Sequence, residues 1–301
     1  MNESQPVDLV LLHTFHEVAR LGSVTKAARE LNRSQPAISH RIRALEQELA
    51  VPLFEKIGRR LKLTEYGRRL QERCFDLIAL SRSIRDVARG SGDDVEGRIA
   101  IGALPTVVSH LLVPAIASLI ERYPKLHLSF VFGYVPELCD HLRTGRVDLI
   151  VVIGGVEATG LTVTDLGSTD LVAVMAPALA PRKSGTIELA ELREHRYLAW
   201  DGPRDVTFDL VDEFVRRHGL ADAYTPGVPH IESLRLLAAA GAGYAILPRY
   251  TISADRDRLV ALRPSRLRRR LPVSLVTRRQ QLATPALQCV AAAIEGIELP
   301  A

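Results

Sequence analysis

The sequence predicts two fold classes in one chain: an N-terminal all-α domain completed by a β-hairpin, and a C-terminal α/β domain. Three observations predict this division. Apolar residues recur at helical spacing up to Leu49, strands alternate with helices from Arg98 onward, and a heptad-like pattern lies between the two regions. The length of 301 residues also suits two domains, since a typical domain has about 100–200 residues.

The composition is that of a folded globular protein, with 47% hydrophobic and 25% charged residues. No basic-then-apolar signal pattern opens the sequence, and no apolar run approaches the roughly 18 residues of a membrane helix. Cys74, Cys139 and Cys289 are far apart and form no metal-spaced pair. We therefore expect a cytoplasmic protein with reduced thiols, no membrane partner, no metal and no cofactor.

Positive charge is concentrated in the first third of the chain. Residues 1–90 hold 16 of the 39 Lys and Arg residues but 11 of the 35 Asp and Glu residues, a net charge of +5, so the rest of the chain sums to −1. This asymmetry favours contact between the N-terminal segment and a polyanion. A solvated basic face is the alternative.

Three helices are predicted in the N-terminal segment. The first ends near Gly22, and its apolar stripe comprises Leu9, Leu12, Phe15, His16 and Ala19. Ser23 is a suitable N-cap for the second helix, and Asn32 suits a left-handed residue at its end. Ser34 predicts the N-cap of the third helix, where Pro36 falls in the first turn and costs no hydrogen bond.

The third helix has one apolar face and one polar face. Its predicted buried stripe comprises Ile38, Ile42, Leu45 and Leu49. The opposite face carries side chains suited to hydrogen bonding, namely Gln35, Ser39, His40 and Arg43. Such a face can enter a DNA major groove and contact base edges.

A basic hairpin follows the three helices. The stretch LFEKIGRRLKLTEYG predicts two short strands that turn at Gly58, which completes a winged helix-turn-helix. The candidate DNA-binding residues are Ser23, Lys26, Ser34, Gln35, Pro36, Ser39, His40, Arg43, Lys56, Arg59 and Arg60. The alternative is a small helical scaffold with a charged turn.

The run LLHTFHEVARLGSVTKAARELNRSQPAISHRIRALEQELAVPLFEKIGRRLKLTEYG resembles the N-terminal domain of LysR-type transcriptional regulators. The matching positions are Phe15, Gly22, Ser23, Ala27, Ala28, Leu31, Ser34, Gln35, Pro36, Ser39, Ile42, Leu45, Glu46, Leu53, Phe54, Thr64 and Gly67. Two positions depart from the pattern. Ala50 stands where the family usually has Gly, and Lys56 stands where it usually has Arg, which removes a bidentate donor.

A long helix is predicted from the cap residue Thr64 to about Arg89. Its heptad-like seam comprises Leu70, Cys74, Leu77, Ser81, Ile84 and Ala88. The resemblance implies that this helix joins two chains, and a helix packed on its own domain is the alternative. The predicted domains are residues 1–63 for DNA binding, 64–90 for the linker and 91–301 for effector binding.

The C-terminal region predicts a parallel α/β domain with a faint internal repeat. PELCDHLRTGRVDLIVVIG and HIESLRLLAAAGAGYAILP each read as a helix, a glycine turn and a buried strand. The stretches LTVTDL and DLVAVMAP are expected to add further strands. The resemblance implies two Rossmann-like lobes, as in periplasmic binding proteins, with lobe I at 98–161 and 266–301 and lobe II at 162–265.

A ligand site is expected between the lobes, where strand ends and helix N-termini converge. Four segments meet that description: 104–107, 133–136, 200–207 and 230–233. Free N–H groups at helix starts favour a carboxylate-bearing effector. The candidate effector-binding residues are Leu104, Pro105, Thr106, Tyr134, Trp200, Arg204, Thr207, Glu232 and Ser233. An ordinary cap or loop role is the alternative for each residue, and a core role is the alternative for Trp200.

The sequence contains no H-E-x-x-H, G-x-S-x-G or phosphate-loop motif, so we name no catalytic residue and expect no enzyme. The predicted function is a LysR-type DNA-binding regulator that binds an inverted-repeat promoter as a dimer or tetramer, tuned by a small-molecule effector. One alternative is a regulator with a vestigial cleft that acts through protein contacts, for example with RNA polymerase. A two-lobed α/β enzyme is the remote alternative.

Overall fold

The structure of the chain is a computed structural model that describes residues 7–57, 60–71, 73–74, 77, 95–157, 159–181, 185–221, 227–252, 258–279 and 284–300. Its N-terminal part, here called the head, contains α1 (Leu9–Leu21), α2 (Val24–Glu30), α3 (Gln35–Leu49), β1 (Phe54–Ile57) and β2 (Arg60–Leu63). A further helix follows Thr64, and its described residues are 65–71, 73–74 and 77. Of the predicted linker seam, Leu70 and Cys74 pack in the head and Leu77 is 42% exposed, whereas Ser81, Ile84 and Ala88 lie outside the described residues.

The helices of the head begin and end where the local sequence predicts. The side chains of Ser23 and Ser34 accept hydrogen bonds from Lys26 N and Ala37 N, each at 3.3 Å. Asn32 is left-handed at φ 51°, as expected. Ala50 ends α3 at φ 55°, a conformation that costs an L-residue about 1–2 kcal/mol and explains the glycine usual in the family.

The hairpin of β1 and β2 is here called the wing. The core of the head is a single cluster formed by α1, α2, α3 and the helix that follows the wing. Its buried members are Leu12, Phe15, Val18, Ala27, Ala28, Ile38, Ile42, Leu45, Leu53 and Cys74. Burial raises the pKa of the Cys74 thiol to about 12, so this side chain packs as a neutral group. Leu9, which helped to predict α1, lies outside this core, because this first residue of the helix is 44% exposed.

Two contacts fix the wing to the helices. Glu46 of α3 accepts hydrogen bonds from Leu53 N at 2.8 Å and Phe54 N at 3.2 Å. The Thr64 hydroxyl donates to Pro52 O at 2.7 Å and accepts from Gly67 N. A Cβ on Gly67 would lie 2.2 Å from Leu53 O, so only glycine fits there. Three positions of the family pattern therefore have structural roles.

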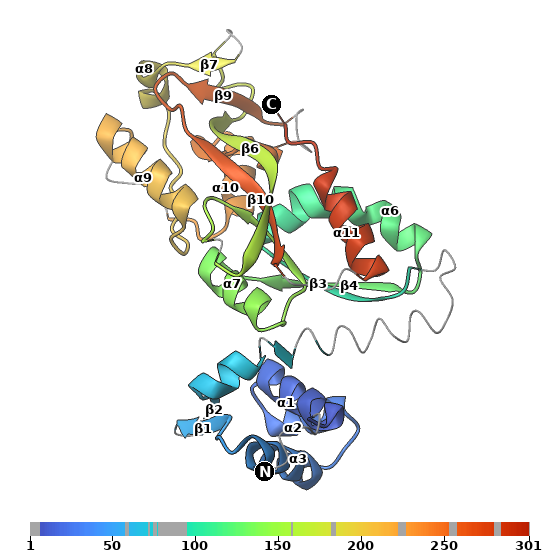
Figure 1. Cartoon of the computed structure of the whole chain (residues 1–301). Helices are drawn as coiled ribbons and strands as arrows, with labels where there is room; N and C mark the ends of the chain where they lie inside the picture. Colours follow the sequence, from blue (N-terminus) through green and yellow to red (C-terminus); the bar gives the residue numbers. More distant parts are fainter. Residues whose placement is uncertain are drawn as a thin grey trace.

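The C-terminal part is α/β and has two lobes (Figure 1). Lobe I contains β3 (Gly97–Ala103), α5 (Pro105–Val107), the π-helix η1 (Val108–Leu112), α6 (Val113–Arg122), β4 (Leu126–Phe132), α7 (Val135–Arg143), β5 (Leu149–Ile153) and α11 (Pro285–Glu295). Lobe II contains β7 (Thr186–Ile187), α8 (Leu189–Arg193), α9 (Val206–His218), α10 (Ile231–Ala239), β8 (Tyr244–Pro248), the 3-10 helix η2 (Arg249–Ile252) and β9 (Val260–Pro264).

Two long strands, β6 (Leu161–Met175) and β10 (Arg270–Arg278), connect the lobes. They pair with each other antiparallel, and the sheet order is β4-β3-β5-β10-β6-β9-β7, with β8 on β6. Two expectations need correction. The sheet is mixed rather than parallel, because β10 returns alongside β6, and 161–175 forms one strand rather than two, since Gly167 at φ 106° does not interrupt it.

Each lobe places helices on both faces of the sheet. In lobe I, Val151 and Ile153 face the cluster that contains α6 and α11, whereas Ile150 and Val152 face α7. In lobe II, the alternate residues of β6 contact α9 on one face and α10 on the other. The predicted repeat is confirmed, because α7–β5 and α10–β8 each form a helix followed by a fully buried strand.

Candidate functional site

The outer face of α3 is polar and open to solvent. Gln35, His40 and Arg43 are exposed, and Ser39 is half-buried. Ile38, Ile42 and Leu45 of the same helix are buried on the opposite side. Gln35 lies close to α2, since the Thr25 hydroxyl donates to its Oε1 at 3.5 Å. One helix face therefore anchors α3 while the other presents hydrogen-bonding groups.

The remaining predicted DNA contacts surround this face. Lys26 of α2 and Pro36 of α3 are exposed, whereas the oxygens of Ser23 and Ser34 accept hydrogen bonds as N-caps and leave their O–H groups to donate. Lys56 lies in β1 and Arg60 lies in β2, where Arg60 pairs with Ile57, the residue after Lys56. Arg59 lies outside the described residues.

The two lobes make direct polar contacts where α5 and η1 of lobe I meet lobe II. The hydroxyls of Thr106 and Tyr250 are 2.9 Å apart. His110, in the π-helical turn η1, places Nε2 2.6 Å from Glu232 Oε1 at the start of α10. Burial raises the pKa of Glu232, but the hydrogen bonds and charges of His110 and Arg235 outweigh burial, so the net shift is downward. Glu232 is therefore a charged link between the lobes.

The start of α9 also touches lobe I. A Cβ on Gly154, at the end of β5, would lie 2.5 Å from Val206 Cγ1. Asp205 caps α9 by accepting from Phe208 N at 2.8 Å. Burial raises the pKa of Asp205, and the N–H groups of the first turn oppose this shift. The expectation that segment 200–207 offers free N–H groups to an anion is wrong, because a carboxyl group of the chain already occupies that position.

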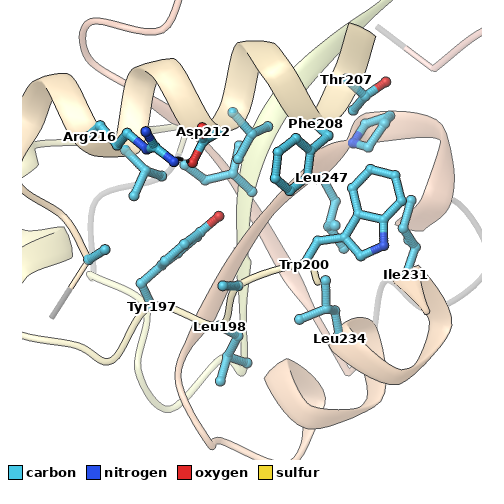
Figure 2. Close-up of a pocket in the computed structure, with 16 residues that line it drawn as sticks. Tyr197, Leu198, Trp200, Thr207, Phe208, Asp212, Arg216, Ile231, Leu234 and Leu247 are labelled. Carbon is cyan, nitrogen blue, oxygen red and sulfur yellow. Dashed lines mark hydrogen bonds and ion pairs between the residues drawn. The ribbon is translucent and has the colours of Figure 1, made fainter. Parts of the chain in front are cut away.

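A pocket of about 170 Å³ lies in lobe II between α9, the start of α10, β8 and segment 197–200 (Figure 2). Of the predicted effector-binding residues, Trp200 and Thr207 line it. The Trp200 ring packs edge-on against Phe208, with centroids 5.6 Å apart, and its Nε1 donates to Pro229 O at 3.2 Å. The indole is therefore fixed in one orientation. Trp200 also packs on the lobe II core, which is the alternative that the sequence left open for it.

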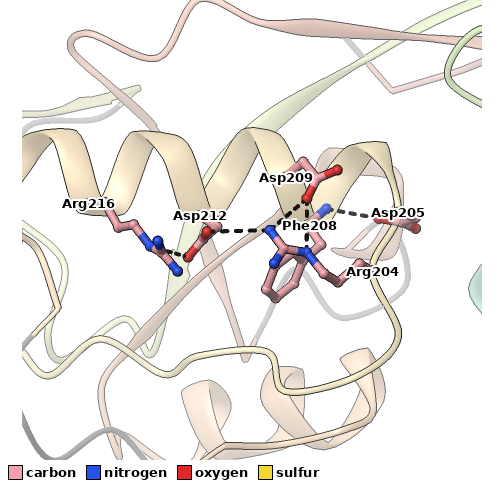
Figure 3. A network of polar contacts seen from close by, with 6 residues as sticks. All are labelled: Arg204, Asp205, Phe208, Asp209, Asp212 and Arg216. Atoms are coloured by element: carbon pink, nitrogen blue, oxygen red, sulfur yellow. Dashed lines mark hydrogen bonds and ion pairs between the residues drawn. The ribbon is translucent and has the colours of Figure 1, made fainter.

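A chain of ion pairs runs along α9 at the edge of this pocket (Figure 3). Arg204 donates from Nε and Nη2 to Asp209 Oδ1 at 3.2 and 2.9 Å, and its guanidinium lies 4.8 Å from the Phe208 ring centroid. Asp212 Oδ1 accepts from Arg216 Nε at 3.0 Å. Arg204 is thus held by protein carboxylates.

Six of the predicted effector-binding residues lie at the starts of helices and do not line the lobe II pocket. Leu104, Pro105 and Thr106 begin the first helix of lobe I, Tyr134 begins α7, and Glu232 and Ser233 begin α10. The sequence prediction missed His110, Tyr250 and Asp205. Asp205 carried a usable signal, since Asp before a helical pattern favours an N-cap. His110 and Tyr250 carried none, because their partners are distant in the sequence.

The fold and the two sites define a DNA-binding regulator joined to a two-lobed ligand-binding-like domain. Residues 92–296 match the model of the LysR substrate binding domain, and residues 9–68 match the bacterial regulatory helix-turn-helix protein, lysR family. The chain therefore belongs to the LysR-type transcriptional regulators.

Curated relatives match over most of both chains. The HTH-type transcriptional regulator AbaB of Streptomyces antibioticus is 32% identical over 81% of this chain and 82% of its own length. The HTH-type transcriptional regulator TfdS of Cupriavidus pinatubonensis is 27% identical over 88% of this chain and 90% of its own length.

Solved structures share the fold. A full-length OxyR variant from Pseudomonas aeruginosa has a TM-score of 0.75 at 21% identity, covering 97% of this chain and 99% of that chain. Full-length CbnR complexed with its target DNA has a TM-score of 0.53 at 21% identity, covering 96% of this chain and 98% of that chain.

Two absences concern the parts of the chain that the structure describes. None of its helices there is both long and apolar enough to cross a membrane. No group of three or more His, Cys, Asp or Glu side chains within those same ranges is arranged to hold a metal ion.

Proposed function

We propose that the polar face of α3 reads a promoter sequence from the major groove, through Gln35, Ser39, His40 and Arg43. The observation that carries the proposal is the division of α3 into a buried stripe and an exposed hydrogen-bonding face. Amide and guanidinium groups suit the base edges of adenine and guanine. In the CbnR structure, a protein of the same fold is complexed with its target DNA.

The residues around α3 position the head on the duplex rather than read it. Lys26 and the hydroxyls of Ser23 and Ser34 contact phosphates beside α3, with Pro36 shaping the first turn. Lys56, Arg59 and Arg60 of the wing contact phosphates or the minor groove. Two heads related by a two-fold axis then require an inverted repeat with half-sites about 10–10.5 bp apart or a multiple of that spacing.

The chain self-associates as a dimer or tetramer through the predicted linker helix at residues 64–90, between the DNA-binding residues 1–63 and the effector-binding residues 91–301. Large apolar side chains exposed on the effector domain offer further contact area, namely Val113, Ile120, Phe132, Leu236 and Leu237. DNA binding places the protein in the cytoplasm with the chromosome. RNA polymerase is a further partner for a promoter-bound oligomer.

The effector binds where the lobes meet, and its anionic group lies at helix N-termini. Among the described residues, α5, α7 and α10 begin without a side-chain hydrogen bond to their first turns, which leaves N–H groups for a ligand carboxylate. The site comprises Leu104, Pro105, Thr106, Tyr134, Trp200, Arg204, Thr207, Glu232 and Ser233. Arg204 must leave Asp209 before it can contact the ligand.

Effector binding shifts a population of lobe arrangements, and this shift changes DNA binding. The Thr106–Tyr250 and His110–Glu232 contacts favour one arrangement, and a ligand that displaces them favours another. A hydrogen bond from Gln71 Nε2 to Thr144 O, 3.3 Å long, connects the helix after the wing to the end of α7. A change in lobe I therefore has a direct contact through which to reach the heads.

The base-reading role is tested by Gln35→Ala in the full-length chain, measured by binding to selected and competitor duplexes. We expect the difference in binding free energy between the selected and the competitor duplexes to fall by about 1–3 kcal/mol, because a bidentate pair is lost. Non-specific affinity should change little. The matched control is Gln47→Ala, which removes the same exposed amide from the other end of α3. Equal weakening on all sequences would contradict base reading by Gln35.

Coupling is tested by calorimetric titration with a panel of metabolites, followed by footprinting with each compound that binds. A footprint that changes in length or position supports the effector mechanism. A bound ligand that leaves the footprint unchanged would overturn it and favour a regulator that acts through protein contacts.

A further inference from the structure

The pocket of lobe II has the size and walls of a site for one aromatic ring. Its volume of about 170 Å³ is close to the about 150 Å³ of an apolar protein cavity that binds benzene. The walls are mainly aliphatic and aromatic: Trp200, Phe208, Val211, Leu234, Ile246 and Leu247. All its described lining residues belong to lobe II, so a ligand can fill the pocket without bridging the lobes.

One end of the pocket is polar. The carboxylate of Asp212, a quarter exposed, lines it, and Figure 2 shows the Tyr197 hydroxyl directed toward the part of α9 that carries Asp212. Burial, Tyr244 and the Asp212 charge raise the pKa of Tyr197, so its O–H group stays protonated. This end therefore combines a charged acceptor with a hydroxyl donor.

The charges around the pocket disfavour an anion. Among the described residues that line it, the cation is Arg216, which is 75% exposed and paired with Asp212. A ligand carboxylate in the pocket would lie near Asp212 and lose water without gaining a buried cation. A neutral hydroxyl has no such penalty, and it can donate to Asp212 while it accepts from Tyr197.

We propose that this pocket binds a small neutral phenol, with the ring between Trp200 and Leu234 and the hydroxyl between Asp212 and Tyr197. Binding of a phenol does not depend on the proposed effector function. Only the role of that ligand in regulation rests on it. Thr207 lines the pocket one residue after Val206, which touches Gly154 of lobe I. A ligand beneath α9 thus acts on a helix that contacts both lobes.

The fluorescence of Trp200 tests binding directly, because it is the single Trp of the chain and lines the pocket. Full-length protein is titrated with phenol, toluene and benzoate, and calorimetry repeats each titration. We expect phenol to change the Trp200 signal and to bind about tenfold more tightly than toluene, the difference of a hydrogen bond to a charged group. Benzoate is expected to bind more weakly than phenol at this site.

Matched variants locate the ligand. Asp212→Asn is expected to reduce the preference for phenol over toluene several-fold, whereas Glu213→Gln removes a negative charge from an exposed position of α9 outside the pocket and should leave the preference unchanged. Val211→Phe fills the pocket and should abolish the Trp200 response. Ala199→Val fills less of the pocket and serves if Val211→Phe does not fold. It is expected to weaken phenol binding, which would also locate the ligand in this pocket.

Equal affinity for phenol and toluene, or phenol binding that survives both filling variants, would overturn the proposal. Stronger binding of benzoate than phenol in this pocket would overturn it as well and would support a carboxylate effector instead. The DNA experiments are independent of these outcomes: loss of base reading by Gln35 leaves phenol binding intact, and absence of phenol binding leaves the operator experiments unaffected.

Discussion

The helices of the head start differently from three of the helices that begin near the lobe junction, whereas α9, capped by Asp205, starts as the head helices do. Each of α1, α2 and α3 has a side-chain cap, supplied by Asp8, Ser23 and Ser34. Within the described residues, α5, α7 and α10 of the effector domain have none, and their N-cap positions hold Leu104, Tyr134 and His230. An uncapped start costs stability, so the difference separates first turns that the fold itself satisfies from first turns without a side-chain cap, and the proposed effector site uses the second kind.

The head and the effector domain have separate hydrophobic cores. Phe15→Ala tests whether the two regions also unfold separately, and it has the largest expected effect. Phe15 is fully buried, and its ring lies 5.4 Å from that of Phe54, so removal should cost about 3–5 kcal/mol of head stability. Denaturant unfolding followed by circular dichroism should show an earlier transition for the head alone. Val163→Ala, at an exposed position of β6 in the effector domain, is the control. A common shift of both regions would show that they unfold as one unit.

Gly154→Ala tests the contact between the lobes. The new Cβ meets Val206, and the backbone at φ 96° is unfavourable for Ala, so we expect a loss of about 1–3 kcal/mol in the effector domain. Adding Val206→Ala should recover the part due to the clash. Thermal unfolding of both variants gives the two contributions, and no recovery in the double variant would assign the whole cost to the backbone.

Ser34→Ala and His230→Ala compare a capped with an uncapped helix start. Ser34 accepts from Ala37 N, so its loss should destabilise the head by about 1 kcal/mol. His230 makes no cap hydrogen bond, so its loss should change stability by less than about 0.5 kcal/mol. Chemical denaturation measures both. Similar costs would contradict the idea that α10 begins without a stabilising cap.

The smallest effect concerns Glu232, whose pKa is lowered in the folded chain. A lowered folded-state pKa gives stability that is present above the unfolded value and is lost as pH falls through the folded value. Because Glu232 is 42% exposed, we expect this contribution to stay below about 1 kcal/mol. Unfolding measured from neutral to acid pH should show a shallower decline for Glu232→Gln. An identical pH profile would remove Glu232 from the link between the lobes.

The sequence predicted the features that depend on local pattern. The stripe of α3, the left-handed Asn32 and the helix–strand repeat follow from periodicity and from turn-forming residues, and they are observed except that Leu49, at the end of the α3 stripe, is half-buried rather than buried. Leu9 repeats at helical spacing but is exposed, because periodicity does not show that a first turn lies beyond the core. The single strand β6 was misread because a glycine predicts an interruption, whereas pairing with β10 continues the strand past Gly167.

The candidate site was less predictable because its contacts join distant parts of the chain. Thr106 was named for its hydroxyl, but its partner Tyr250 comes from the other lobe. The pocket beneath α9 requires the positions of four separate segments, which no single stretch of sequence provides. Arg204 was named for its charge, and in the structure that charge is paired with Asp209, an acidic residue in the first turn of α9.

The hydrogen bond between Gln71 and Thr144 has a consequence for building hybrid regulators. A chimaera that grafts this head onto foreign lobes keeps the amide of Gln71 but replaces the carbonyl that receives it. On the proposed mechanism, such a fusion would bind its operator and yet respond poorly to an effector, unless the recipient offers a matching acceptor at the end of α7. Junctions chosen after that helix, rather than before the first strand, preserve the pair.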